Sequence, residues 1–259
     1  MDTVQLADIS SREFKNYISE GGDLAVFPIG KTERLGPHLP LTARNYVVSA
    51  ISNLIAQNNN GYCLPVLPYT TIKDLGKTPG SVDVSSDILY DLIKDIFNEL
   101  VRNGIRQIIA VSYLDELYYI VNEYFQDKDI APVWLSPDRI PVKEDNKHIR
   151  ETSLIAASLK ILGKEKLLNK VLEENEKQKG EYVESSESSG KAPFMNQNNI
   201  AIGYQYQENE YEILPVDKIF VDKTVSAIKN WIEEKNTSVK ALREYNYYID
   251  RGRFDRGLR

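Results

Sequence analysis

The sequence predicts an α/β fold, a single three-layer α/β/α domain with a mostly parallel central sheet. Short, continuous apolar runs at 24–29 and 105–111 are typical of strands that are buried on both faces. Segments with apolar residues at helical spacing, such as 43–57 and 86–103, lie between such runs. Strands that alternate with helices along a chain indicate a parallel sheet with helices on both of its sides.

The expected elements follow this alternation through the first half of the chain. They are a helix at 12–20, strands at 24–29 and 63–67, helices at 43–57 and 86–103, a loop at 76–84, a strand at 105–111, a helix that starts at 117–124 and a strand at 131–135. Gly104 follows the 86–103 helix and is predicted to cap its C-terminal end. Loops 30–44 and 112–116 both follow strand ends, so we expect them to meet at one pocket at that edge of the sheet.

The second half of the chain is more polar. Residues 173–191 are rich in Glu, Lys, Ser and Gly, which predicts a mobile acidic loop. Alternating apolar residues predict a β-hairpin over 200–221, and a helix is expected at 222–235. We therefore expect one domain over 1–242 and a Tyr/Arg-rich C-terminal tail over 243–259, whose last nine residues hold four Arg and one Asp.

The amino-acid composition limits which kinds of protein and which kinds of binding partner are expected. The net charge of −6 gives no general attraction to nucleic acid or to an anionic membrane, so neither is an expected partner. The sequence contains no apolar run of about 18 residues that would span a membrane. Cys63 is the only cysteine, which excludes an intrachain disulfide and favours a cytoplasmic location. The only histidines are His38 and His148, few for a metal centre built on imidazole ligands.

The segment after the first strand resembles the signature of the creatininase (creatinine amidohydrolase) family. Residues 28–41 read PIGKTERLGPHLPL, and the family pattern is P-x-G-[ST]-x-E-x-H-G-x-H-L-P-L. Shorter matches follow in the same order, at Gly80–Val84, Asn103–Ile109 and Glu151–Leu154, so the resemblance spans about residues 10–165. The resemblance implies the creatininase fold.

The resemblance also implies a dinuclear Zn or Mn centre that hydrolyses a small amide, but most ligand positions are changed. Glu33 and Glu116 fall on carboxylate ligand positions, whereas Leu35, Arg44 and Leu114 fall on the other three. The family's proton-transfer His aligns near Asn146. Hydrocarbon side chains cannot coordinate these ions, and a guanidinium repels them. We therefore expect neither a metal nor another cofactor.

A permanent cation offers a replacement for the metals. Without metals, Glu33 and Glu116 would be buried like charges that raise each other's pKa or destabilise the fold. Arg44 could bridge both carboxylates through its planar fork, as the ion pair of the old pocket. The alternative is that Arg44 points to solvent and water surrounds the carboxylates.

Other residues have a structural and a functional interpretation. The candidate catalytic residues are Glu33, His38, Asp115 and Glu116. For His38 a hydrogen bond to loop backbone is the simpler role, and His148 reads as a surface residue. The apolar surroundings of Cys63 indicate a buried, inert thiol. Residues 151–153 read first as a helix N-terminal cap.

Three functions stay open. The first, which the ligand losses favour, is a creatininase-family protein without amidohydrolase activity that serves as a binding or scaffolding subunit. The resemblance implies ring-like assemblies, so its partner would be its own copies or a homologous, active subunit. The second is a divergent amidohydrolase for a small cyclic amide or formamide, with a single Zn or Mn or no metal. If the chain is an enzyme, it is thus a hydrolase of non-peptide C–N bonds. The third is a sensor that binds a small molecule in the old pocket.

Overall fold

The structure is a computed structural model that describes residues 4–72, 79–128, 132–144, 146–188 and 206–257. Its centre is a four-stranded parallel sheet in the order β2-β1-β3-β4. The strands are β1 (Leu24–Ile29), β2 (Tyr62–Cys63), β3 (Gln107–Ser112) and β4 (Val133–Leu135). Ile29 pairs with Ser112 in the register, so β1 and β3 end side by side.

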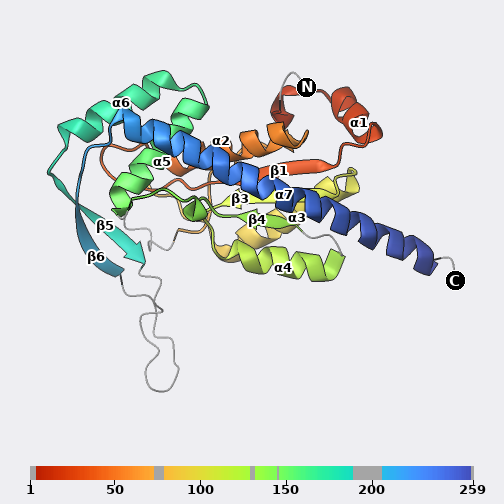
Figure 1. The fold of residues 1–259 in the computed structure, drawn as a ribbon. Coiled ribbons are helices and arrows are strands. Elements are labelled where there is room, and N and C mark those ends of the chain that lie inside the picture. Colours follow the sequence, from red (N-terminus) through yellow and green to blue (C-terminus); the bar gives the residue numbers. More distant parts are fainter. Residues whose placement is uncertain (1–3, 73–78, 129–131, 145, 189–205, 258–259) are drawn as a thin grey trace, which may run out of the picture.

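Helices cover both faces of this sheet (Figure 1). They are α1 (Ser11–Ser19), α2 (Ala43–Asn58), α3 (Ser86–Arg102), α4 (Leu117–Lys128), α5 (Lys147–Ile161), α6 (Glu165–Lys177) and α7 (Lys218–Gly257), with short 3-10 helices at Leu6–Asp8 and Pro137–Arg139. Val26 and Ile109 pack with α2, α5 and α7 in one core, whereas Phe27 and Ile108 pack with α1, α3 and α4 in the other. Alternate side chains of a strand point to opposite faces, so each strand contributes to both cores. The predicted three-layer α/β/α fold is confirmed.

Several local predictions are also confirmed. The predicted helices at 12–20, 43–57 and 86–103 correspond to α1, α2 and α3, each within one residue at either end. Gly104 follows α3 with a φ of 99°, a left-handed conformation that glycine adopts without strain. The strand expected at 63–67 is shorter, because only Tyr62–Cys63 pair regularly with β1 and a single bridge joins Leu67 to Ile29.

The polar second half differs from its predictions. Residues 173–177 finish α6, and Tyr182–Ser188 form β5, so the loop expected at 173–191 is wrong over its described part. β5 pairs with β6 (Tyr206–Glu212) in a separate antiparallel ribbon, which replaces the hairpin expected within 200–221; residues 189–205 lie outside the described part. Residues 243–257 continue α7 as helix, and the division into a domain and a C-terminal tail stays a prediction.

Candidate functional site

The loop after β1 is held in place by hydrogen bonds at the carboxyl edge of the sheet. The Glu33 N–H donates to the Leu41 carbonyl at 2.9 Å, which closes the loop on itself. The Thr32 hydroxyl donates to the Pro68 carbonyl at 2.9 Å, and the Thr32 carbonyl accepts the Val82 N–H at 3.0 Å. The loop therefore presents the Glu33 side chain in a fixed position next to the first turn of α2, where Arg44 lies.

Gly30 is required where β1 meets the start of α2. A Cβ atom at this position would lie 1.9 Å from Oδ1 of the buried Asn45, far inside van der Waals contact. The Gly30 N–H donates to the Leu67 carbonyl at 2.9 Å, and its carbonyl accepts the Thr70 hydroxyl at 3.1 Å. The absence of a side chain thus lets the strand end, the following loop and α2 approach one another.

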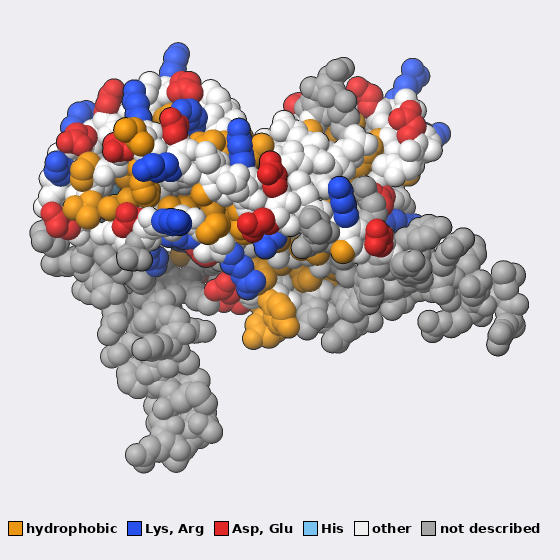
Figure 2. All heavy atoms as spheres, in the orientation of Figure 1, with side chains coloured by type: hydrophobic (Ala, Val, Ile, Leu, Met, Phe, Trp, Pro, Cys, Tyr) orange, Lys and Arg blue, Asp and Glu red, His pale blue; other side chains and the backbone are white. Residues whose placement is uncertain are grey.

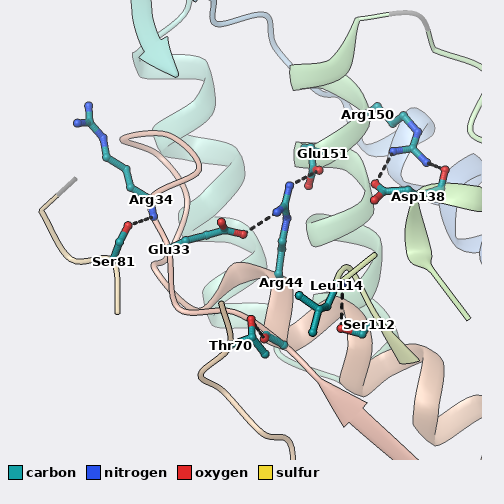
Figure 3. Close-up of polar contacts among 11 residues, drawn as sticks. Glu33, Arg34, Arg44, Thr70, Ser81, Ser112, Leu114, Asp138, Arg150 and Glu151 are labelled. Atoms are coloured by element: carbon teal, nitrogen blue, oxygen red, sulfur yellow. Dashed lines mark hydrogen bonds and ion pairs between the residues drawn. The ribbon is translucent and has the colours of Figure 1, made fainter. Parts of the chain in front are cut away.

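Arg44 joins two carboxylates at the centre of the site (Figure 3). Its Nη1 atom lies 2.6 Å from Oε1 of Glu33, and its Nη2 atom lies 2.9 Å from Oε1 of Glu151. The expected pair with Glu33 is therefore present, but the second carboxylate is Glu151 where Glu116 was expected. Charged hydrogen bonds from two nitrogens of one rigid guanidinium fix the loop, α2 and α5 relative to one another.

The charge of Arg44 depends on these carboxylates. Its side chain is only 15% exposed and lies in the first turn of α2, where the helix dipole disfavours a cation. Burial alone would lower the pKa of the guanidinium, but Glu151 and Glu33 raise this pKa well above its usual value. The ring of Tyr113 lies 4.6 Å from Cζ of Arg44, within range of a cation–π interaction. Arg44 is thus a permanent, enclosed cation.

Glu151 is the site residue whose role the sequence did not predict. It lies one turn inside α5 and is buried, and the cap of that helix is Asn146, whose Oδ1 accepts the N–H groups of His148 and Ile149. The predicted capping role of residues 151–153 is therefore wrong. Burial would raise the pKa of Glu151, but Arg44 outweighs this effect and lowers it. A carboxylate that precedes the apolar stretch of a helix needs a partner when it is buried, which is the sequence signal that could have identified it.

His38 is buried and bonded to α5. Its Nε2 atom lies 2.9 Å from the Thr152 hydroxyl, so its partner is a side chain of α5 and the expected bond to loop backbone is corrected. Burial, with a smaller effect from nearby His148, lowers the pKa of His38 from 6.5 to about 4. His38 is therefore a neutral imidazole at physiological pH. His148 is partly buried and does not lie free on the surface as predicted.

Acid should destabilise the protein through His38. Between pH 6.5 and about 4, the unfolded chain binds a proton at this position that the folded chain excludes, so the free energy of unfolding falls as the pH falls. The variant His38→Gln should lose this part of the pH dependence. Urea unfolding at a series of pH values measures it. His148→Gln should raise the pKa of His38 and so narrow the pH range over which the free energy of unfolding falls. If the free energy of unfolding of His38→Gln depends on pH as steeply as that of the wild type, His38 is not the group responsible.

The remaining candidates lie around this centre. Asp115 is exposed and Glu116 is partly buried, in the turn between β3 and α4. Leu114 is almost fully buried, and Leu35 is partly buried against the core beneath α2. The Cys63 thiol is buried as predicted, with 1% exposure, and burial raises its pKa to about 12.

Several buried polar atoms of the site have no hydrogen-bond partner in the described structure. They are His38 Nδ1, Arg44 Nε, Tyr113 OH and Glu151 Oε2. Unsatisfied buried atoms are uncommon in folded proteins, and water or a bound molecule usually explains them. Donors and acceptors are both present among these four atoms.

The residues present do not fit a dinuclear metal centre. Leu35, Arg44 and Leu114 stand where the resemblance places ligands, and Arg44 directs its guanidinium at Glu33, one of the carboxylates that a metal would need. Among the described residues, no group of three or more His, Cys, Asp or Glu side chains could hold a metal ion. The side chains at this edge of the sheet therefore form an ion pair and not a set of metal ligands.

Comparisons with known proteins agree with this architecture. The family model "Creatininase: Creatinine amidohydrolase" matches residues 7–113. A creatinine amidohydrolase of Pseudomonas putida is 22% identical over 115 residues, which make up 42% of this chain and 44% of the relative. The matched part thus spans less than half of that relative's length.

Solved structures match nearly the whole chain. A crystal structure of creatinine amidohydrolase (creatininase) covers 91% of this chain and 98% of its own, with 17% identity and a TM-score of 0.60. A mutant creatininase complexed with creatine covers 92% of this chain and 99% of its own, with 15% identity and a TM-score of 0.63. The fold is that of the creatininases. Over residues 7–113 the chain resembles the creatininase family, and Leu35, Arg44 and Leu114 stand at three of the ligand positions that this resemblance implies.

The surface of the protein gives fewer indications of function than the site does. Acidic and basic side chains mix over α6 and the adjacent part of α7 on the face in Figure 2, so this region is not a patch of one charge. Within the described residues, none of the helices is long and apolar enough to cross a membrane.

Proposed function

We propose that this protein is a creatininase-fold binding or scaffolding subunit that has lost dinuclear-metal amidohydrolase activity. The observation that supports this proposal is the Arg44 guanidinium, held 2.6 Å from Glu33 and 2.9 Å from Glu151. A fixed cation in that position compensates the carboxylates without a metal and repels divalent ions. The subunit would assemble with its own copies or with a homologous, active subunit.

Metal content tests this proposal directly. Protein purified without chelators and dialysed against Zn or Mn should retain far less than the pair of ions of a dinuclear centre, as measured by plasma mass spectrometry. The matched control is the triple variant Leu35→His, Arg44→Asp, Leu114→His, which restores the donor types that the resemblance places there. This variant should gain metal. Two tightly held ions per wild-type chain would refute the proposal.

A second candidate function is small-molecule binding at the same site. The unpaired buried atoms, above all Glu151 Oε2 and Tyr113 OH, favour it because a ligand with amide or amidine groups would satisfy both donors and acceptors. Creatine and creatinine serve as probes. A ligand that raises the melting temperature of the wild type but not of Glu151→Gln would support this function, whereas absence of binding by calorimetry would speak against it.

The amidohydrolase alternative, with Glu33, His38, Asp115 and Glu116 as its catalytic residues, stays a prediction. Hydrolysis of a formamide or lactam by the wild type, lost in Glu116→Gln, would support it. Burial lowers the pKa of His38 to about 4, so His38 is neutral at physiological pH but a weak base, which counts against it as the general base.

A further inference from the structure

The outer face of α3 carries more charge and more exposed apolar surface than the core requires. Carboxylates recur at every fourth residue and are exposed, forming an acidic stripe of Asp87, Asp91, Asp95 and Glu99. Ile88 and Leu92 are 65% and 41% exposed, although Leu89 and Ile93 beside them are buried. Like charges four residues apart destabilise a helix, so the helix itself does not account for the acidic stripe.

A pocket lies at the C-terminal end of this face. Its volume is about 390 Å³, within the range of binding pockets. It lies between α3 and the N-terminal segment and is lined by apolar Leu6, Phe14, Ile96 and Leu100, with Asp95 and Glu99 exposed beside them. Arg102 pairs with Glu99 at 2.8 Å, but both side chains are largely exposed, so this pair exchanges at little cost. The pocket suits an apolar side chain with cationic neighbours.

The end of α7 has the complementary composition. Residues 251–259 hold four Arg and one Asp, and Phe254 lies one helical turn after Arg251. The helix continues to Gly257, and Figure 1 shows it passing beyond the edge of the sheet to the C-terminus. The described part of α7 thus carries a segment of basic composition with one aromatic residue beyond the edge of the sheet.

This segment cannot reach the outer face of α3 in the same chain. The N-terminal part of α7 packs through Ile228, Trp231 and Val239 into the core that it shares with α2 and α5. The residues of α3 belong to the core on the opposite face of the sheet. A continuous helix on one face cannot bend around to the outer surface of the opposite layer, so the acceptor must be a second copy.

We infer that the C-terminal end of α7 docks on the α3 face of a second copy of this chain. Phe254 enters the pocket, and the arginines of residues 251–259 lie along the acidic stripe. Two copies can exchange these ends reciprocally, which doubles the contact. The inference rests on the proposed function only in that the protein acts as a subunit of an assembly. It does not depend on the loss of metal binding, because Arg44 takes no part in the interface.

Cross-linking tests the pairing in the full chain. Cys63 is the only cysteine and is buried, so engineered thiols react without background. A Glu99→Cys chain co-expressed with an Arg251→Cys chain should give a disulfide-linked pair under mild oxidation. The matched control replaces Glu99→Cys with Glu173→Cys on the exposed face of α6 and should give none. A missing link in the first pair, or an equal link in the control, would overturn the inference.

Charge reversal gives a second readout, by sedimentation velocity. Asp95→Lys/Glu99→Lys should dissociate the pair, as should Arg251→Glu/Arg253→Glu/Arg256→Glu, and the combined variant should restore association. Added salt should weaken the association of the wild-type copies, because salt screens the charges. A wild type that stays monomeric at high concentration would exclude a second copy as the occupant. So would dissociation by only one of the two charge-reversal variants. The metal content of these variants should match the wild type, so failure here is distinguishable from failure of the proposed function.

Discussion

Replacing Arg44 with methionine should lower the free energy of unfolding at pH 7 by about 3–5 kcal/mol, as expected when a buried ion pair loses one partner. The apolar stem is largely kept, so the loss reports the charge and its hydrogen bonds to Glu33 and Glu151. Urea unfolding followed by circular dichroism measures it. The matched control is Lys160→Ala, which removes an exposed ion pair with Asp222 and should leave the stability nearly unchanged.

The pH dependence of this loss has a definite sign. In the wild type, Arg44 holds the pKa of Glu151 below its usual value, so this contribution to stability is present at neutral pH and is lost as the pH falls through the folded pKa. In Arg44→Met, burial raises the pKa of Glu151, and only the weaker effects of Lys147 and Arg150 oppose it. The cost of the substitution should therefore shrink on acidification, as the buried carboxylate takes up a proton.

A double variant separates charge from packing. Arg44→Met/Glu151→Gln removes the uncompensated charge and should recover a substantial part of the loss at pH 7. Equal stability of the single and double variants at this pH would contradict the electrostatic account. A loss below about 1 kcal/mol in the single variant, a value typical of exposed pairs, would also contradict it.

Substituting Gly30 with alanine should destabilise the protein by about 1–3 kcal/mol, the usual cost of overpacking a filled interior. The added Cβ would lie 1.9 Å from Oδ1 of Asn45, so β1 and α2 would have to separate. That movement would displace Arg44, the neighbour of Asn45, from its carboxylates. Thermal and urea unfolding measure the effect.

The matched test is a double-mutant cycle with Asn45→Ala. Removal of the amide oxygen should relieve most of the clash, so Gly30→Ala should cost much less in that background than in the wild type. Strictly additive losses would show that the contact between these two residues is not the cause.

The sheet could be predicted from sequence because its strands are continuous apolar runs with helices between them. Leu24–Ile29 is buried along its whole length, and the pattern alone identifies such a strand. The second half of the sequence contains no equivalent pattern of apolar runs. β5 and β6 are strands of mostly polar residues, whose pairing depends on each other and not on a buried face.

The site could be predicted in part. Glu33 and Arg44 lie in one short segment, so the loop that joins β1 to α2 brings them together. Glu151 is 107 residues from Arg44 in the chain, and the packing of α2 against α5 decides their contact. Composition indicated that Arg44 needs carboxylates, but only this packing selects Glu151. The partner of His38 was missed for the same reason, because Thr152 also lies on α5.

Under the proposed loss of activity, the Asn146 cap bears on whether hydrolysis could return by evolution. The resemblance places a proton-transfer histidine near this position, but here the side chain secures the first turn of the helix that carries Glu151. Reversion there would sacrifice a cap, at about 1 kcal/mol, before any catalytic benefit existed. Replacement of Arg44 would meet a larger barrier, so under the proposed loss of activity the folding role of these residues would itself oppose a return of the metal site.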